Sequence, residues 1–214
     1  FRLSAGITQQ HHALAQALQQ IGHVLNHLGA VCPIGLGAGG PDQVGSCALE
    51  GYGFIVLGTA LAAVVEGFHM ISRPVFDGLR ITAETPVSRA VANYALDLAF
   101  TVPAYVAILA VIWWFIRRYR YAPWLYALVF GLAQALGDGG LAYFAERPAM
   151  LAFLPYPMTN YHAMNVVPFL AIADRLGPDR GAGPVRWLAI PAVIATYFAC
   201  GALIRWVGAA TVLP

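Results

Sequence analysis

The sequence contains a series of apolar segments that are each long enough to cross a lipid bilayer. A membrane-spanning helix needs about 20 predominantly apolar residues. Segments of this kind lie at 52–72, 90–116, 122–145, 158–173 and 187–210, the fourth of which is short and contains Pro168. Hydrophobic residues make up 59% of the chain and charged residues only 10%, whereas about a quarter of an ordinary globular chain is charged. We therefore predict an all-α polytopic membrane helix bundle with about five transmembrane helices.

The charged residues predict the orientation of these helices. The basic residues are all arginine and the net charge is +2, so the chain lacks a strongly basic surface for nucleic acid. The connections before the first segment and after the second and fourth hold seven arginines, whereas the opposite connections hold four. By the positive-inside rule, the N-terminal segment then lies inside. A lysine-free composition rich in alanine and glycine is typical of a GC-rich bacterial genome, which predicts an integral protein of a bacterial inner membrane.

The first 51 residues form a separate region, rich in histidine and glutamine, that ends in a glycine- and proline-rich loop. No Asp, Glu, Lys or Arg occurs between Arg2 and Asp42. Apolar residues recur along one helical stripe at Leu14, Leu18, Ile21, Leu25 and Leu28. Three interpretations of this amphipathic or polar helix stay open: a surface helix, a contact with another subunit, or a polar first span. Because the chain begins with Phe1, we expect that a preceding segment was removed or left out.

Two histidines in this region are weak candidate ligands for a metal or a tetrapyrrole. His23 and His27 are four residues apart, so they would share one helical face. The alternative is an ordinary solvated polar face. His11 and His12 are adjacent and would point in different directions. The stretch 35–40 lacks the Lys-Ser/Thr ending of a phosphate-binding loop, and we interpret it as a connector.

The cysteines leave a question of compartment open. Cys32 and Cys47 flank the glycine-rich loop, and a disulfide between them would need an oxidising environment. That requirement conflicts with the inside orientation that the arginines predict. Cys200 lies within the last apolar segment and is expected to be a small core residue.

Polar side chains occur at matched positions in the first four apolar segments. Ionisable residues inside a membrane span are costly, so they usually face a bundle interior or a water-filled cavity. Successive spans run antiparallel, and at roughly 1.5 Å per residue the four side chains fall about 9–11 Å below the same membrane face. These residues are Glu66, Asp97, Asp138 and Asn165. The matched depth predicts one polar cluster inside the bundle.

Further polar residues lie close to these positions. His69 follows the first acid by three residues and His162 precedes the asparagine by three, spacings that share a helical face. Tyr143 and Tyr161 could add hydroxyl groups, so we predict that these residues and Asp138 line the ligand pocket. The alternative is that each polar group only bonds helices together. For Asp138, flanked by glycines, the alternative is a brace for a distorted turn.

A pair of buried acids inside apolar walls suits one class of chemistry. Burial and mutual repulsion favour one protonated and one ionised carboxyl group, which are the states of a general acid and of a base that stabilises a cation. Such a pair could protonate an alkene in a lipid and stabilise the resulting carbocation. This proton chemistry requires no nucleotide, flavin or metal, and we predict no cofactor.

The first four segments carry motifs that resemble those of a known family. The stretches are VVEGFH, LDLAFTVPAYVAILAVIWWFIRRY, GLAQALGDGGLAYFAERP and TNYHAMNVVPFLAIADRL. They are similar to the Ile-Glu-Gly-Trp, acid-bearing, Gly-Gln-x-x-Gly-Asp-x-x-Tyr-Phe and Met-Asn segments of the emopamil-binding protein family, the sterol isomerases of the EXPERA domain. The resemblance covers roughly 52–176 and implies a four-helix membrane core, whereas 177–214 adds a loop and a further transmembrane helix.

The resemblance also implies roles for individual residues. By their positions in the motifs, Glu66 and Asp97 would be the catalytic acids, and Asn165 would form hydrogen bonds in the pocket. Asp97 stands where the family has a glutamate. Ala62 stands at the position of the family's catalytic histidine, and Pro168 at the position of a tryptophan.

Two functions from different classes therefore remain open. The first is a membrane protein that binds a sterol, an isoprenoid or another lipid and moves a double bond. The second is a non-catalytic accessory subunit of a larger membrane complex, in which the N-terminal helix and the additional C-terminal helix contact partners. The missing histidine favours the second function and the retained acids favour the first. A proton or ion transporter is a third interpretation, supported by the buried acids alone.

Overall fold

The structure is a computed structural model that describes residues 41–177 and 180–211. The predictions for the N-terminal region, among them the amphipathic helix and the His23 and His27 site, lie outside the described residues. The same holds for Cys32 and for the side chain of Cys47, so the predicted disulfide stays a prediction.

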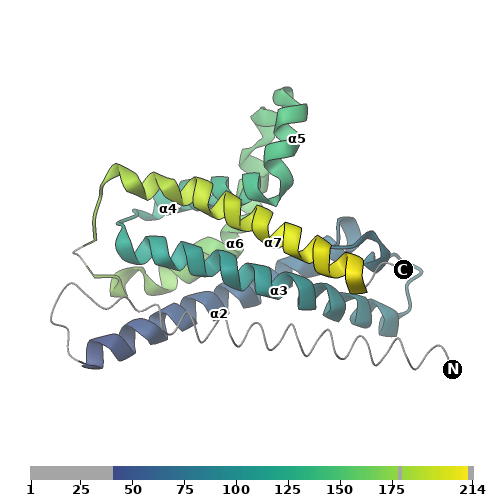
Figure 1. Ribbon diagram of the computed structural model, residues 1–214, viewed down its shortest axis with the longest axis horizontal. Helices are drawn as coiled ribbons and strands as arrows, with labels where there is room; N and C mark the ends of the chain where they lie inside the picture. The colour runs from purple at the N-terminus through teal and green to yellow at the C-terminus, as the bar shows by residue number, and fades with distance from the viewer. Residues whose placement is uncertain (1–40, 178–179, 212–214) are drawn as a thin grey trace.

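The described chain consists of helices and their connections (Figure 1). The long helices are α2 (Pro41–Ser72), α3 (Val87–Arg118), α4 (Pro123–Ala135), α6 (Pro155–Ile172) and α7 (Ala189–Thr211). The short elements are η1 (Asp77–Leu79), the π-helical η2 (Leu136–Gly140), α5 (Leu141–Glu146), η3 (Pro148–Phe153), η4 (Ala173–Arg175) and η5 (Pro184–Leu188).

The predicted class, an all-α membrane helix bundle, is confirmed. Within the described residues, 4 helical segments are long and apolar enough to cross a membrane: Leu49–Ser72, Val87–Arg118, Pro123–Glu146 and Pro184–Ala209. These are the first, second, third and fifth predicted segments. The fourth predicted segment is α6, which forms a helix within the bundle but is not among these candidates.

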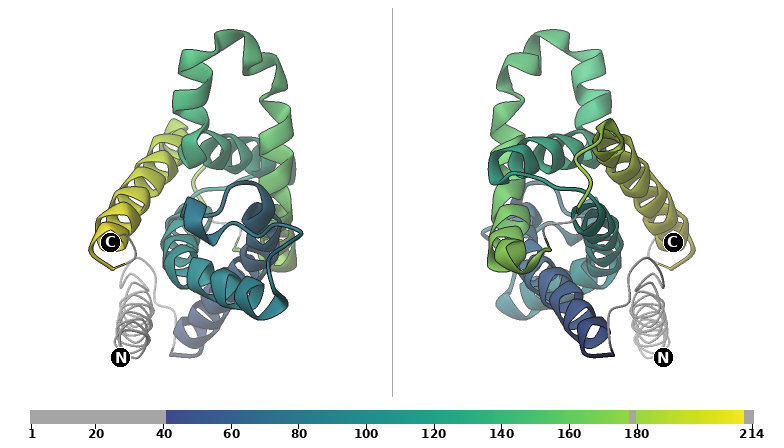
Figure 2. Two further views of the ribbon diagram at one scale, coloured as in Figure 1. Left: turned by 90° about the vertical axis from the view of Figure 1, so that its right-hand side faces the viewer. Right: turned by 90° about the vertical axis from the view of Figure 1, so that its left-hand side faces the viewer.

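The helices pack around one apolar core, with helices that follow one another in the chain running antiparallel and with α7 parallel to α4. α6 lies between α2 and α4, α3 lies against α2, and α7 covers α3 and α4 (Figures 1 and 2). The core is closed by aromatic stacking between α4 and α6, where the Tyr126 and Phe169 rings lie 3.9 Å apart at an interplanar angle of 8°. Small residues bring α2 and α3 together, as is common in membrane bundles. A Cβ atom on Gly58 would lie 2.8 Å from Leu109.

The third predicted segment is bent rather than straight. In η2, Asp138 and Gly139 leave the helical conformation, and the φ of Gly139 is 87°. Gly140 also needs to be glycine, because a Cβ atom there would lie 2.1 Å from the carbonyl oxygen of Ala135. The bend turns α5 away from α4, so that α5, η3 and the start of α6 form an arch that stands out from the bundle (Figures 1 and 2). The glycines therefore permit the bend.

Replacing Gly139 by alanine tests this account of the bend. A residue with a side chain costs about 1–2 kcal/mol in the left-handed conformation, and the space around Gly139 is otherwise open. We expect Gly139→Ala to lower the melting temperature of the purified protein. The matched control is Gly53→Ala in α2, which also faces open space and has no positive φ. Equal melting temperatures for the two variants would contradict the strained bend.

Candidate functional site

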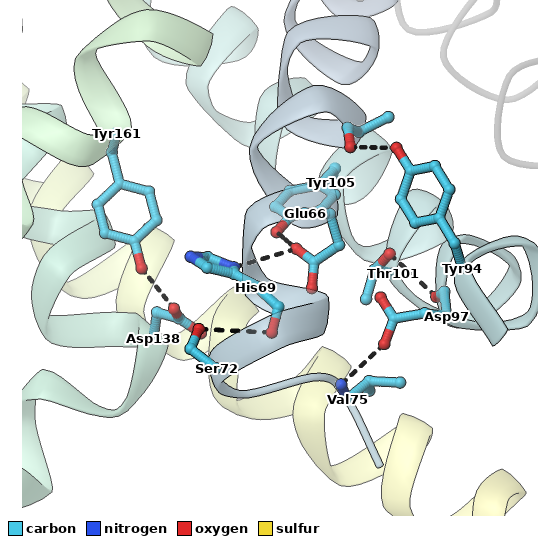
Figure 3. Close-up of polar contacts among 11 residues, drawn as sticks. Glu66, His69, Ser72, Val75, Tyr94, Asp97, Thr101, Tyr105, Asp138 and Tyr161 are labelled. Carbon is cyan, nitrogen blue, oxygen red and sulfur yellow. Dashed lines mark hydrogen bonds and ion pairs between the residues drawn. The ribbon is translucent and has the colours of Figure 1, made fainter. Parts of the chain in front are cut away.

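Two carboxylic acids are buried where the end of α2 lies beside the first half of α3. Glu66 of α2 is 4% exposed and Asp97 of α3 is fully buried. Burying an acid in an apolar bundle is costly unless its oxygen atoms find partners. Figure 3 shows both side chains in the space between the two helices. The structure thus brings together the two predicted catalytic residues.

Glu66 is held by two polar side chains. The Tyr105 hydroxyl of α3 donates a hydrogen bond of 2.5 Å to Oε2 of Glu66. The same oxygen lies 3.4 Å from Nδ1 of His69, one turn along α2. We call Glu66, His69, Asp97 and Tyr105 the acid cluster (Figure 3). The predicted neighbourhood of His69 and Glu66 is therefore present, and Tyr105 adds a hydroxyl group.

Asp97 has one satisfied and one unsatisfied oxygen atom. Its Oδ1 accepts a hydrogen bond of 2.8 Å from the backbone N–H of Val75, in the connection that follows α2. Its Oδ2 is buried and has no hydrogen-bond partner in the described part of the chain. Glu66 and Asp97 interact both through their charges and through a side-chain hydrogen bond, which forms when one of the two acids carries a proton. An oxygen atom in this position can bind a proton or a donor group of a ligand.

Asp138 lies on another side of the same region. The Tyr161 hydroxyl of α6 donates a short hydrogen bond to Oδ2 of Asp138, which ties the bend to α6 (Figure 3). Asp138 also interacts electrostatically with His69 and Glu66. The bond to Tyr161 agrees with the interpretation of Asp138 as a brace, and the electrostatic contacts place Asp138 next to the acid cluster. The predicted contact of Asp138 and Tyr161 with a ligand stays a prediction.

The side chain of Asn165 in α6 is bonded to α4 and not to the acid cluster. Its side chain and that of Gln134 of α4 form a reciprocal amide pair, with N···O distances of 2.5 and 2.8 Å. Both residues are 1% exposed. The amide pair leaves the Asn165 side chain engaged with α4. The predicted matched depth is wrong for Asn165, because its neighbour Met164 is level with Gly58, eight residues before Glu66 in α2.

Two other predicted pocket residues also point elsewhere. His162 lies against α4, with Nε2 3.3 Å from the carbonyl oxygen of Ala127. Tyr143 of α5 is 39% exposed, and the guanidinium of Arg147 lies 5.1 Å from its ring centroid. Neither residue has a described contact with the acid cluster, so their ligand-binding roles stay predictions.

Sequence reasoning missed two tyrosines that the structure brings to this region. Tyr105 follows Asp97 by eight residues, about two helical turns, so the spacing places both on one face. Tyr197 of α7 packs against the bend, where a Cβ atom on Gly137 would lie 2.7 Å from its ring. Its hydroxyl is buried without a hydrogen-bond partner among the described residues and interacts electrostatically with Asp138. No pattern in the sequence indicates Tyr197.

The position at which the motif likeness would place a histidine is filled by a small apolar residue. Ala62 is 1% exposed and packs with Ala135, Tyr161 and Met164. The only histidine close to Glu66 in the described chain is His69, one turn in the other direction. No group of three or more His, Cys, Asp or Glu side chains arranged to hold a metal ion is found within the described ranges.

No protein-family model, curated protein or solved structure matches this chain. The likeness to the emopamil-binding protein family therefore rests on the motifs of the first four apolar segments.

The bond between Tyr105 and Glu66 gives a prediction for stability. A hydrogen bond to a charged group contributes about 1.5–3 kcal/mol, so we expect Tyr105→Phe to reduce the free energy of unfolding by that amount. Denaturant unfolding in detergent measures it. Tyr156→Phe is the control, because Tyr156 is 72% exposed and the change should leave stability unaltered. A Tyr105→Phe protein as stable as the control would show that the bond does not hold Glu66.

The amide pair gives a second prediction. Asn165→Leu leaves both polar atoms of the Gln134 amide group unpaired in an apolar site, at a cost of about 1–3 kcal/mol. The double variant Gln134→Leu with Asn165→Leu removes both partners and should recover part of that loss. Unfolding free energies of the wild type, both single variants and the double variant complete the cycle. Additive losses would contradict direct coupling between the two side chains.

Proposed function

We propose that this protein is an EXPERA-like integral membrane protein that binds a sterol, an isoprenoid or a related lipid and shifts its double bond by proton transfer at the acid cluster. The observation that carries the proposal is the pair of buried carboxyl groups of Asp97 and Glu66, in which Oδ2 of Asp97 has no donor from the rest of the described chain and the two acids interact through a side-chain hydrogen bond. The motif likeness supports the same function. The lysine-free, alanine-rich composition supports a location in a bacterial inner membrane.

In the proposed reaction Asp97 acts as the general acid and Glu66 as the general base. Protonated Asp97 gives its proton to one alkene carbon, whose new C–H bond takes the π electrons and leaves a carbocation on the adjacent carbon. Ionised Glu66 then removes a proton from a neighbouring carbon, and the electrons of that C–H bond form the shifted double bond. The lipid gains one proton and loses one. A proton that returns from Glu66 to Asp97 restores the starting state.

The residues around the acids act by positioning them. Tyr105 and His69 hold Oε2 of Glu66, and the Val75 N–H holds Oδ1 of Asp97. These bonds leave the two carboxyl groups facing one another, where they interact through a side-chain hydrogen bond along which a proton can pass. His69 takes the place of the family's histidine on the opposite side of Glu66. The side chain of Met164 and the ring of Tyr161, which pack near Ala62, are apolar surfaces that suit a hydrocarbon substrate.

Isotope exchange tests this function. The reconstituted protein is offered sterols or isoprenoids with a movable double bond in deuterated water, and deuterium in the product is measured by mass spectrometry. We expect incorporation by the wild type and a rate lower by about 10²–10⁴-fold in Asp97→Asn and Glu66→Gln, the usual contribution of a general acid or base. Asp77→Asn is the matched control, because Asp77 pairs with Arg80 on the surface.

The outcomes of this experiment separate the two functions. Deuterium incorporation that survives Asp97→Asn would refute the proposed role of the acids. Wild-type protein that binds these lipids but incorporates no deuterium would refute the isomerase and leave a lipid-binding protein. If the wild type neither binds these lipids nor incorporates deuterium, the accessory subunit is the remaining function.

One observation favours the accessory subunit as the second candidate. α7 belongs to the least buried of the apolar spans, and Phe198, Leu203 and Trp206 on its surface are 46%, 51% and 72% exposed. Such a helix faces either lipid or a partner. Purification in mild detergent distinguishes these cases, because an accessory subunit should copurify with defined partners, whereas a monomer without partners counts against it.

A further inference from the structure

The end of the bundle opposite the acid cluster is rich in arginine. α3 ends there, α4 begins there, and the connection between α6 and α7 returns there (Figure 1). We call this region the arginine end. Its basic residues are Arg117, Arg118, Arg120, Arg175, Arg180 and Arg186.

Backbone bonds join the two connections into one surface. The Arg120 N–H donates to the Gly181 carbonyl at 2.8 Å, and the Gly181 N–H donates to the Arg118 carbonyl at 3.2 Å. The Arg180 side chain donates a bond of 2.9 Å to the carbonyl of Ile116 in the last turn of α3. Side chains that are distant in sequence are therefore held close together.

Four of these arginines have no ion pair within the described chain. No carboxylate in residues 41–177 and 180–211 forms an ion pair with Arg118, Arg120, Arg180 or Arg186. Burial, and then the charge of Arg120, lower the pKa of the Arg180 guanidinium. Nε of Arg186 is buried and lacks a hydrogen-bond partner among the described residues. Asp174 lies at the same end, on the exposed surface of η4.

Tryptophans lie beside these arginines. Four of the five tryptophans of the chain are near the arginine end, and the fifth is Trp206. Three of them contact guanidinium groups, at distances of 5.7 Å for Arg117 and Trp113, 5.7 Å for Arg118 and Trp114, and 5.9 Å for Arg186 and Trp187. Trp124 is 68% exposed. Tryptophans gather at the level of lipid headgroups, so the nearby guanidinium groups lie at that level too.

We propose that the arginine end binds the phosphate groups of anionic phospholipids. Guanidinium groups bind phosphate oxygens through two parallel hydrogen bonds, and basic residues beside membrane spans attract anionic lipids. The tryptophans favour a lipid over a soluble phosphate compound, because they place the cations in the headgroup layer. The site is distant from the acid cluster and does not depend on the proposed isomerase.

The other end of the bundle provides the contrast. There Arg80 pairs with Asp77 at 3.0 Å, Glu84 and Glu146 add exposed negative charge, and the connection between α2 and α3 contains no tryptophan. The arginine end also holds acids, among them Asp174 and Glu50 near the start of α2, but it differs from the other end in its tryptophans and in the lack of an ion pair on Arg118 and Arg120 among the described residues.

Native mass spectrometry tests the proposal on the full chain. The protein is released from vesicles of equal parts phosphatidylcholine and phosphatidylglycerol, and the retained lipids are counted. We expect several-fold enrichment of phosphatidylglycerol on the wild type. The double variant Arg118→Gln with Arg120→Gln should lose most of this enrichment. The matched control Arg80→Gln with Arg89→Gln removes the same charge at the other end and should keep it.

Further variants and a phosphate control separate loss of lipid binding from loss of the fold. The single variant Arg120→Gln changes an exposed side chain, so it keeps the fold, and it should lose part of the enrichment. Arg118→Lys with Arg120→Lys keeps the charge and should retain more phosphatidylglycerol than the glutamine variant. Equal enrichment in all variants, or none in the wild type, would overturn the proposal. If inorganic phosphate in phosphatidylcholine vesicles raises the melting temperature as much as phosphatidylglycerol does, the site binds free phosphate instead.

Discussion

The cost of placing polar groups inside an apolar bundle shapes this structure more than any other interaction. Lipid and apolar side chains offer no hydrogen bonds, so buried polar groups have to find partners within the protein. Gln134 and Asn165 satisfy one another, and the Tyr126 hydroxyl donates to the Asn165 carbonyl. These pairs fix how α4 and α6 are rotated about their axes. Apolar side chains hold the helices together, and the polar pairs determine which helix faces are in contact.

The exceptions to this rule are concentrated on a few atoms. Within the described chain these are Oδ2 of Asp97, the hydroxyl of Tyr197, Oγ1 of Thr59 and Nε of Arg186. The first two belong to the region around the acid cluster and the bend. Unpaired buried groups are costly, and proteins tend to keep them where they serve a function. This contrast with the satisfied Gln134 and Asn165 pair distinguishes a candidate reaction site from a structural contact.

Most of the fold could be predicted from the sequence, because membrane spans are long and their hydrophobicity is a strong signal. The predicted segment 52–72 ends at the same residue as α2, and 158–173 differs from α6 by a few residues. The bend at Gly139 was foreseen only as a possible distortion, because glycine permits a positive φ without requiring it. The predicted third span is therefore present but turns sharply at η2.

The sequence predicted only part of the candidate site, because it does not show how each helix is rotated about its axis. Counting residues from a helix end gives the depth of a side chain but not the direction in which it points. Glu66 and Asp97 meet as predicted, whereas Asn165 faces Gln134 and its neighbour Met164 is level with Gly58, about 12 Å before Glu66 along α2. The contribution of Tyr197 depends on the packing of α7 against α4 and η2, which no local pattern of residues encodes.

The straight part of the third span is short. α4 has 13 residues, which extend about 20 Å at roughly 1.5 Å per residue, whereas the hydrocarbon layer of a bilayer is about 30 Å thick. The apolar stretch itself continues through η2 and α5 to Glu146, so the rest of the crossing falls to a helix that changes direction. Asp138 therefore lies at the break in the span, where the regular backbone hydrogen bonding is interrupted.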